Sequence, residues 1–76
     1  MQLGTRWVVG DAPPAQLVAP IVLAIRDVEA QLAEVDTSAW RWTLTWLESR
    51  PVVTLDDGTT ILVSREGAIS VEYEQP

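Results

Sequence analysis

The sequence predicts an α+β fold, in which one helix packs on one face of a mostly antiparallel sheet in the order β-α-β-β-β-β. Three observations predict it: an apolar stripe at helical spacing over residues 18–35, an alternation of apolar and polar residues over 39–48, and three turn signals after it. A chain of 76 residues has room for one small core, so we expect a single domain spanning residues 1–76.

The first two elements are read from their periodicity. Leu3–Val9 alternates as a first strand, which we expect at an edge of the sheet, and Gly10–Pro14 ends it because adjacent prolines cannot continue a ladder. The helix is expected from about Pro20 to about Val35, because Pro20 suits a first helical turn. Leu23 falls on the face of this helix away from the stripe. The stripe consists of Val18, Ile21, Ile25, Val28, Leu32 and Val35.

The alternating stretch is typical of a half-buried strand whose large apolar side chains share one face. These side chains are Trp40, Trp42, Leu44 and Trp46. We expect that face to form the core under the helix rather than an aromatic ligand platform, because tryptophans are mostly buried. Among the tryptophans, Trp40 is expected to be the most exposed and Trp7 the next.

Four strands in a meander follow the helix. The turns are predicted at Glu48–Pro51, at Asp56–Thr59, where Asp57-Gly58 suits a type I′ hairpin, and at Arg65–Ala68. If each loop has two residues, apolar side chains meet across every strand pair on the tryptophan face. The expected pairs are Trp46 with Val53, Leu44 with Leu55, Val53 with Leu62, and Leu62 with Val71, while Ile69 and Tyr73 join the same face.

This order of elements resembles the cystatin/monellin architecture. The resemblance is one of topology, because the first predicted hairpin turn, Glu48–Pro51, lacks the glutamine-valine-glycine signature of cystatins. It therefore implies a two-layer fold and does not carry over the inhibitor activity of that family.

Composition excludes several classes of function. The chain has no cysteine, histidine or lysine, which removes thiolate metal sites and the usual catalytic bases. Its net charge of −6 argues against binding to nucleic acid. The start of the chain lacks a signal peptide and no apolar run could span a bilayer, so we expect no membrane association and a cytoplasmic location. Arginine without lysine suggests a GC-rich bacterial or phage genome.

Two acidic pairs deserve separate consideration. Asp56 and Asp57 are too few for a cation site and are interpreted as turn residues. Glu72 and Glu74 share a face of the last strand, where an acid/base pair is conceivable, but an acidic edge that blocks strand-to-strand aggregation is the simpler interpretation. We therefore expect no catalytic residue, no metal ligand and no cofactor.

The outer face of the sheet is unusually apolar in this interpretation. A contiguous apolar patch on a small domain indicates a contact surface, although β-branched residues are also simply good strand formers. The candidate partner-binding residues are Leu23 on the helix and, on the sheet, Leu47, Val52, Ile61, Val63, Glu72 and Glu74.

The sequence thus predicts a small acidic domain without enzymatic activity that binds a protein, of the immunity, inhibitor or accessory-subunit type. Its acidic contacts would be Asp56, Asp57, Glu66, Glu72 and Glu74. Two alternatives remain open: a binder of a small apolar ligand, with a pocket between helix and sheet, and a homodimeric structural protein. The partner is expected to be another protein or a second copy of the chain.

Overall fold

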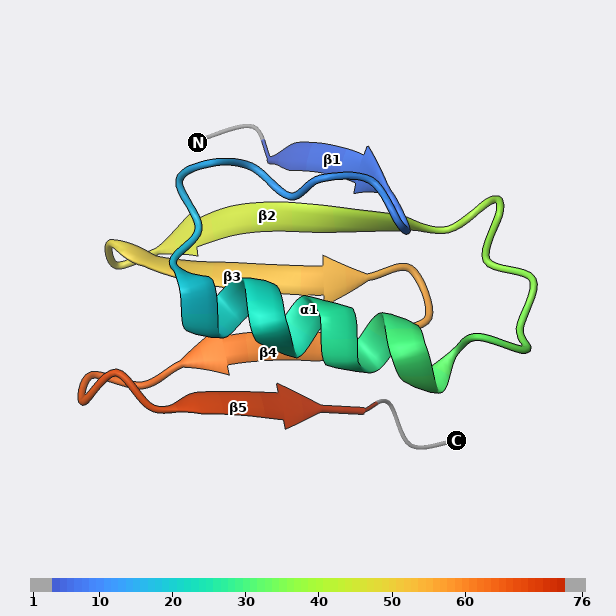
Figure 1. Cartoon of the computed structure of the whole chain (residues 1–76). Coiled ribbons are helices and arrows are strands. Elements are labelled where there is room, and N and C mark those ends of the chain that lie inside the picture. The colour runs from blue at the N-terminus through green and yellow to red at the C-terminus, as the bar shows by residue number, and fades with distance from the viewer. Residues whose placement is uncertain (1–3, 74–76) are drawn as a thin grey trace.

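A computed structural model of the chain describes residues 4–73 and has the predicted order of elements (Figure 1). One helix packs against a five-stranded sheet whose spatial order is β1-β2-β3-β4-β5 and whose neighbouring strands are all antiparallel. The α+β class is therefore confirmed, with the first strand at an edge. The elements are β1 (Thr5–Val8), α1 (Ala19–Gln31), β2 (Arg41–Leu47), β3 (Arg50–Leu55), β4 (Thr60–Val63) and β5 (Ile69–Glu72).

Helix α1 is shorter than the stripe predicted. Val18 is the N-cap and Pro20 lies in the first turn, as expected, but the helix ends at Gln31 and Leu32 is its C-cap. Val35, the last residue of the stripe, is 45% exposed because the chain has already left the helix. The helix lies nearest to β4 and β5.

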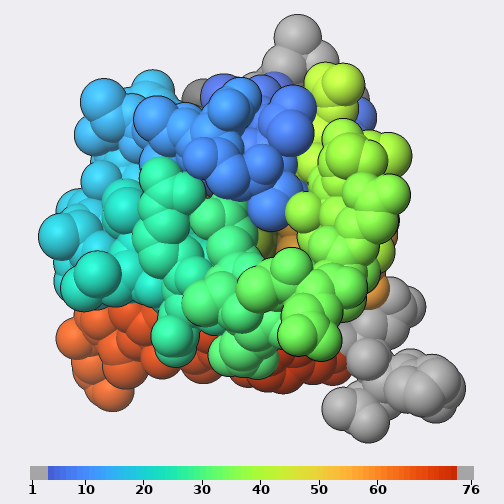
Figure 2. Space-filling view, turned by 45° about the vertical axis from the view of Figure 1, so that its right-hand side comes forward, coloured from blue at the N-terminus to red at the C-terminus, as the bar shows by residue number. Residues whose placement is uncertain are grey.

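The core lies between α1 and one face of the sheet, which we call the inner face. Figure 2 shows α1 and the segments on either side of it covering the molecule from this side, with the C-terminal strands at the lower edge. The side chains of Trp42, Leu44, Val53, Leu55 and Ile61 are buried on the inner face. From the helix layer, Leu17, Ile21, Ile25 and Val28 close the same core.

Glu29 of α1 forms hydrogen bonds to β2 and to the segment that follows β1. Its Oε2 accepts hydrogen bonds from the indole Nε1 of Trp42 at 3.0 Å and from the backbone N–H of Gly10 at 3.0 Å. Its Oε1 accepts a bond from Arg26 at 2.9 Å, so both carboxylate oxygens are bonded and the side chain is only 11% exposed. Charge-assisted bonds of this kind are stronger than neutral ones, so Glu29 fixes the helix over β2.

The tryptophans differ in exposure from the sequence prediction. Trp46 is the most exposed, at 41%, whereas Trp40 is half-buried and Trp7 is buried. Trp46 lies near the end of β2, opposite Pro51 and next to the hairpin turn, whereas Trp42 lies where Glu29 of α1 is bonded to β2. The expectation that Trp40 and then Trp7 would be the most exposed is therefore wrong.

The three hairpin turns are of two kinds. Glu48 and Ser49 join β2 to β3 with φ of 52° and 66°, the positive values that a two-residue type I′ turn requires. The other two loops have three residues, Asp56-Asp57-Gly58 and Arg65-Glu66-Gly67, and each ends in a glycine of positive φ. The type I′ turn is therefore at Glu48-Ser49 and not at Asp57-Gly58.

These loop lengths correct the predicted register. Val53 pairs with Ile61 instead of Leu62, and Ile61 pairs with Val71, because each three-residue loop shifts the following strand by one residue. In the first hairpin the observed register differs from the predicted one by two residues, since Leu44 pairs with Val53 and Trp46 with Pro51. A shift of two residues leaves the same side chains on the inner face. The two single shifts cancel at β5, so Ile69 and Val71 still pack against the core as expected.

Candidate functional site

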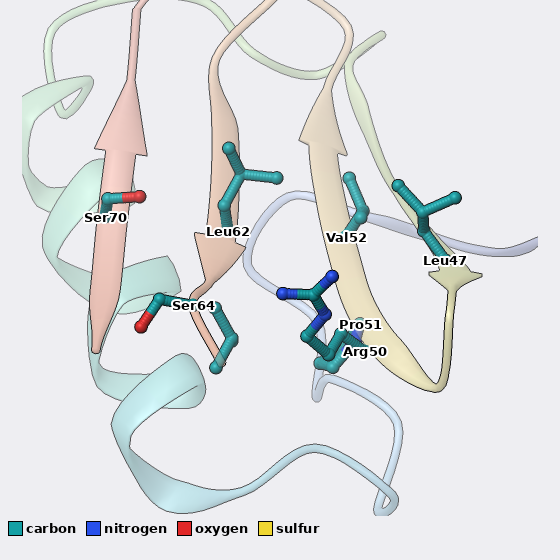
Figure 3. Close-up of a pocket in the computed structure, with 8 residues that line it drawn as sticks. Leu47, Arg50, Pro51, Val52, Leu62, Ser64 and Ser70 are labelled. Atoms are coloured by element: carbon teal, nitrogen blue, oxygen red, sulfur yellow. The ribbon is translucent and has the colours of Figure 1, made fainter. Parts of the chain in front are cut away.

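The face of the sheet opposite α1, which we call the outer face, carries a groove of about 310 Å³. In Figure 3 the side chains of Leu47, Val52 and Leu62 stand on three neighbouring strands, with Ser70 beyond them and the guanidinium group of Arg50 reaching over the groove. The lining residues are Leu47, Arg50, Pro51, Val52, Leu62, Val63, Ser64 and Ser70. The groove thus combines an apolar floor with one cation, Arg50.

The register arranges the outer face in rows across the strands. One row runs from Thr45 through Val52 and Leu62 to Ser70. The next row begins with Arg6 on β1, continues with Thr43, Thr54 and Thr60, and ends with Glu72 on β5. The first row, which we call the apolar strip, has Val52 and Leu62 at its centre and a hydroxyl group at each end. The second, which we call the hydroxyl strip, has a cation at one edge of the sheet and an anion at the other.

The charges on and around the outer face are balanced. Arg6, Arg41 and Arg50 are matched by Glu48, Asp56 and Glu72. Arg50 contacts Glu48 at 3.0 Å and Arg6 contacts Asp56 at 3.3 Å, and both pairs are at least one-third exposed. Exposed pairs of this kind contribute little to stability, so their side chains can rearrange toward a partner at small cost. The excess negative charge of the chain lies elsewhere, largely in the helix layer.

Three predicted site residues line the groove: Leu47, Val52 and Val63. Leu47 is 62% exposed and Val52 is half-buried, and both line it. Glu72 is exposed on the same face, at the end of the hydroxyl strip, whereas Glu74 lies outside the described residues. Leu23 is 69% exposed on α1, so it belongs to the opposite layer and does not share a surface with the groove.

One predicted position, Ile61, is corrected, and Val63 proves to be shared between the core and the groove. Ile61 is 1% exposed in the core, because the one-residue shift turns it inward, so it does not lie on the outer face. Val63 is half-buried: it packs against the core opposite Ile69 and also borders one end of the groove.

The sequence prediction missed Leu62 and Arg50 as site residues. Leu62 was expected inside and instead stands at the middle of the groove, while Arg50 was assigned to a turn. The signal that could have placed Leu62 on the outer face is Gly58, because a three-residue hairpin loop has a glycine of positive φ at its third position. The sequence Asp57-Gly58 also fits a two-residue loop, so the signal does not separate the two loop lengths.

The acidic residues near the turns have structural partners. Asp56 accepts hydrogen bonds from Arg6 and from the backbone N–H of Arg41, and Asp57 accepts one from the N–H of Thr59 at 2.8 Å. Within residues 4–73, no group of three acidic side chains is placed to hold a metal ion. Hydrogen bonds from the side chain and backbone of Ser38 lower the pKa of Asp36, which lies beyond the end of α1.

Comparison with known proteins does not place the chain in a family. No family model matches it, and searches of curated proteins and of solved structures find no similar chain. Among residues 4–73, no helix is long and apolar enough to cross a membrane.

Proposed function

We propose that this chain is a small non-enzymatic interaction domain that binds a protein through the outer face of its sheet. The observation that carries the proposal is the groove lined by Leu47, Val52 and Leu62 on the face that α1 leaves uncovered. Apolar side chains gathered on one exposed face, with polar groups around them, are typical of protein-binding surfaces.

The remaining features support a binding role over catalysis. The chain supplies no histidine, cysteine or lysine, and the groove is lined by aliphatic groups, hydroxyl groups and a single arginine. We propose that it acts as an inhibitor, immunity or accessory-subunit protein, whose acidic helix layer remains in solvent when the outer face is occupied. Its location in the cytoplasm and its origin in a bacterium or phage stay predictions.

The order of the strands supports a finer proposal about the fold. We propose that the two layers have the cystatin/monellin-like topology that the element order resembles. The support is the sheet order β1-β2-β3-β4-β5 with α1 connecting the two antiparallel neighbours β1 and β2.

The alternative of a small apolar ligand between helix and sheet has less support. That space is occupied by side chains such as Ile25, Trp42 and Val53, none of which exposes any surface, whereas the groove lies on the other side of the sheet. A ligand in the core would have to displace packed side chains, which costs free energy that a preformed pocket would not require.

The experiment compares two variants of immobilised protein in a pull-down from extract of the source organism. Leu62→Glu puts a carboxylate in the middle of the groove, and Leu23→Glu puts the same charge on the exposed face of α1 as a matched control. We expect a protein that wild type and Leu23→Glu retain, that Leu62→Glu loses, and that is released as salt increases because charges contribute at the rim.

Two results would contradict the proposal. Equal retention by Leu62→Glu would show that the partner does not use the groove. A shift of tryptophan fluorescence on adding apolar compounds, without any protein retained by wild type, would favour the ligand binder instead, because Trp42 lies in the core where such a ligand would sit.

A further inference from the structure

The outer face has a symmetry that the proposed interaction surface does not by itself require. Val52 and Thr54 lie on β3, the central strand, and the hydroxyl strip has matching residues on either side of Thr54. In the apolar strip Val52 is flanked by Thr45 on β2 and Leu62 on β4, with Leu47 one row further along β2, while Thr43 and Thr60 flank Thr54 in the hydroxyl strip. At the two edges of the sheet the same strip ends in opposite charges, Arg6 and Glu72.

From this arrangement we propose that the occupant of the outer face is a second copy of the same chain, related by a two-fold axis parallel to β3. Rotation about such an axis places β2 over β4 of the other copy and β1 over β5. Val52 then faces Val52, Leu62 lies over Thr45 with Leu47 next to it along β2, and the threonines of the hydroxyl strip meet those of the other copy. This inference rests on the proposed function, because it names the partner of that same face.

Charge complementarity is the reason for choosing a second copy. The axis places Arg6 of each copy opposite Glu72 of the other, which gives two symmetric ion pairs at the rim. The Arg6–Asp56 contact within the chain does not prevent this, since Arg6 is 54% exposed there. The outer face is close to neutral, so the net charge of −6, which lies largely in the helix layer, does not oppose the contact.

The size of the face indicates a weak, reversible contact. Five strands roughly 4.8 Å apart, of at most seven residues, form a face of about 20 by 20 Å. Two copies would bury on the order of 800–1,000 Å², which is at the low end for specific interfaces. We therefore expect a reversible dimer with a Kd in the tens of micromolar range, of the order found for weak, transient complexes.

The test is sedimentation equilibrium of the purified full chain from about 10 to about 500 µM, a range that brackets such a Kd. Wild type and the control Leu23→Glu should dimerise equally. Val52→Glu should be a folded monomer, because two carboxylates would meet on the axis. Thr54→Arg repeats the test with two cations at the second axial position, and circular dichroism checks that each variant folds.

A charge reversal tests the axis itself. Arg6→Glu and Glu72→Arg should each weaken the dimer by about tenfold, and the double variant should restore it, because the pair is then re-formed with opposite polarity. If net charge alone mattered, Glu72→Arg would strengthen the dimer, since it makes the chain less negative. Failure of the double variant to recover would overturn the proposed axis.

The outcomes separate this inference from the proposed function. A wild type that stays monomeric at every concentration overturns self-association, while a protein captured through the groove in the pull-down would still support the interaction domain. A dimer that Val52→Glu and Thr54→Arg leave intact overturns the use of the outer face by a second copy. A dimer lost in both variants, with no other protein captured, supports the second copy and contradicts a heterologous partner.

Discussion

The inner and outer faces of the sheet are formed by the same strands, yet neighbouring residues of similar size have different surroundings. Val53 is fully buried on the inner face, while Val52, the residue before it, is half-buried on the outer face. Ile61 is 1% exposed and Leu62, the residue after it, lines the groove. Apolar side chains therefore become core where α1 and its flanking segments cover the sheet, whatever their residue type.

The same comparison explains why the outer face is the candidate site. Threonines occupy much of it, as expected of a solvated sheet face, but Leu47, Val52 and Leu62 interrupt them at one end. Helix α1 covers the opposite face of the sheet and leaves these three residues lining an open groove. Substitutions that place the same change on each face therefore separate stability from binding.

The largest contrast is expected from a carboxylate at adjacent positions of β4. Ile61→Glu should prevent folding, because an unpaired charge would be buried in the core between β3 and β5. Leu62→Glu should fold, because its carboxylate points into the open groove. Circular dichroism and thermal melting distinguish the two. A folded Ile61→Glu together with an unfolded Leu62→Glu would show that the sheet faces the other way.

Which of Ile61 and Leu62 faces the core could not be predicted from the sequence. Element order and the inner face of β2 follow from periodicity, the edge position of β1 follows from the meander of the other four strands, and all three are found. In β4 the run Ile61-Leu62-Val63 is apolar throughout, so alternation cannot say which residue faces inward. The length of the loop between β3 and β4 decides which residue faces inward, and Asp57-Gly58 is compatible with a loop of two or three residues. The groove could not be predicted, because its central residue was assigned to the core.

The next contrast is between truncations on the two faces. Leu44→Ala should destabilise the fold by about 2–5 kcal/mol, because it leaves a cavity between buried neighbours. Val52→Ala, on the outer face, should cost about 1 kcal/mol or less, because Val52 is only partly removed from water. Chemical denaturation measures both. Equal losses in the free energy of unfolding would mean that the outer face is also covered, as in a stable dimer.

A smaller contrast lies within the inner face, between two paired tryptophans. Trp7 and Trp42 are opposite each other on β1 and β2, but only the indole N–H of Trp42 is bonded, to Glu29, whereas that of Trp7 has no partner among the described residues. Replacement by phenylalanine removes similar volume at both sites. Trp42→Phe should therefore cost about 1.5–3 kcal/mol more than Trp7→Phe, the worth of a hydrogen bond to a charged group.

The control for this pair is Glu29→Gln. Its amide oxygen can still accept the bond from Trp42 but without the charge, so the loss in unfolding free energy should be smaller than for Trp42→Phe. If Trp7→Phe proves as costly as Trp42→Phe, the bond between Glu29 and Trp42 is not what holds the helix layer over β2.

The smallest effect is expected at the turn that joins β2 to β3 beside the groove. Glu48 and Ser49 both have positive φ, a conformation that costs a residue with a side chain roughly 1–2 kcal/mol. The double variant Glu48→Asn/Ser49→Gly supplies the residues that a type I′ turn favours, and the greater freedom of glycine in the unfolded chain offsets part of the gain. We expect a net stabilisation of about 1 kcal/mol, measured by the denaturation midpoint.

Because Glu48 also contacts Arg50, the matched control is Glu48→Gln, which removes the charge and keeps the turn. That control should leave stability nearly unchanged, since the pair is exposed. A double variant that is less stable than wild type would show that the Glu48–Arg50 pair, and not backbone conformation, determines the stability of this end of the outer face.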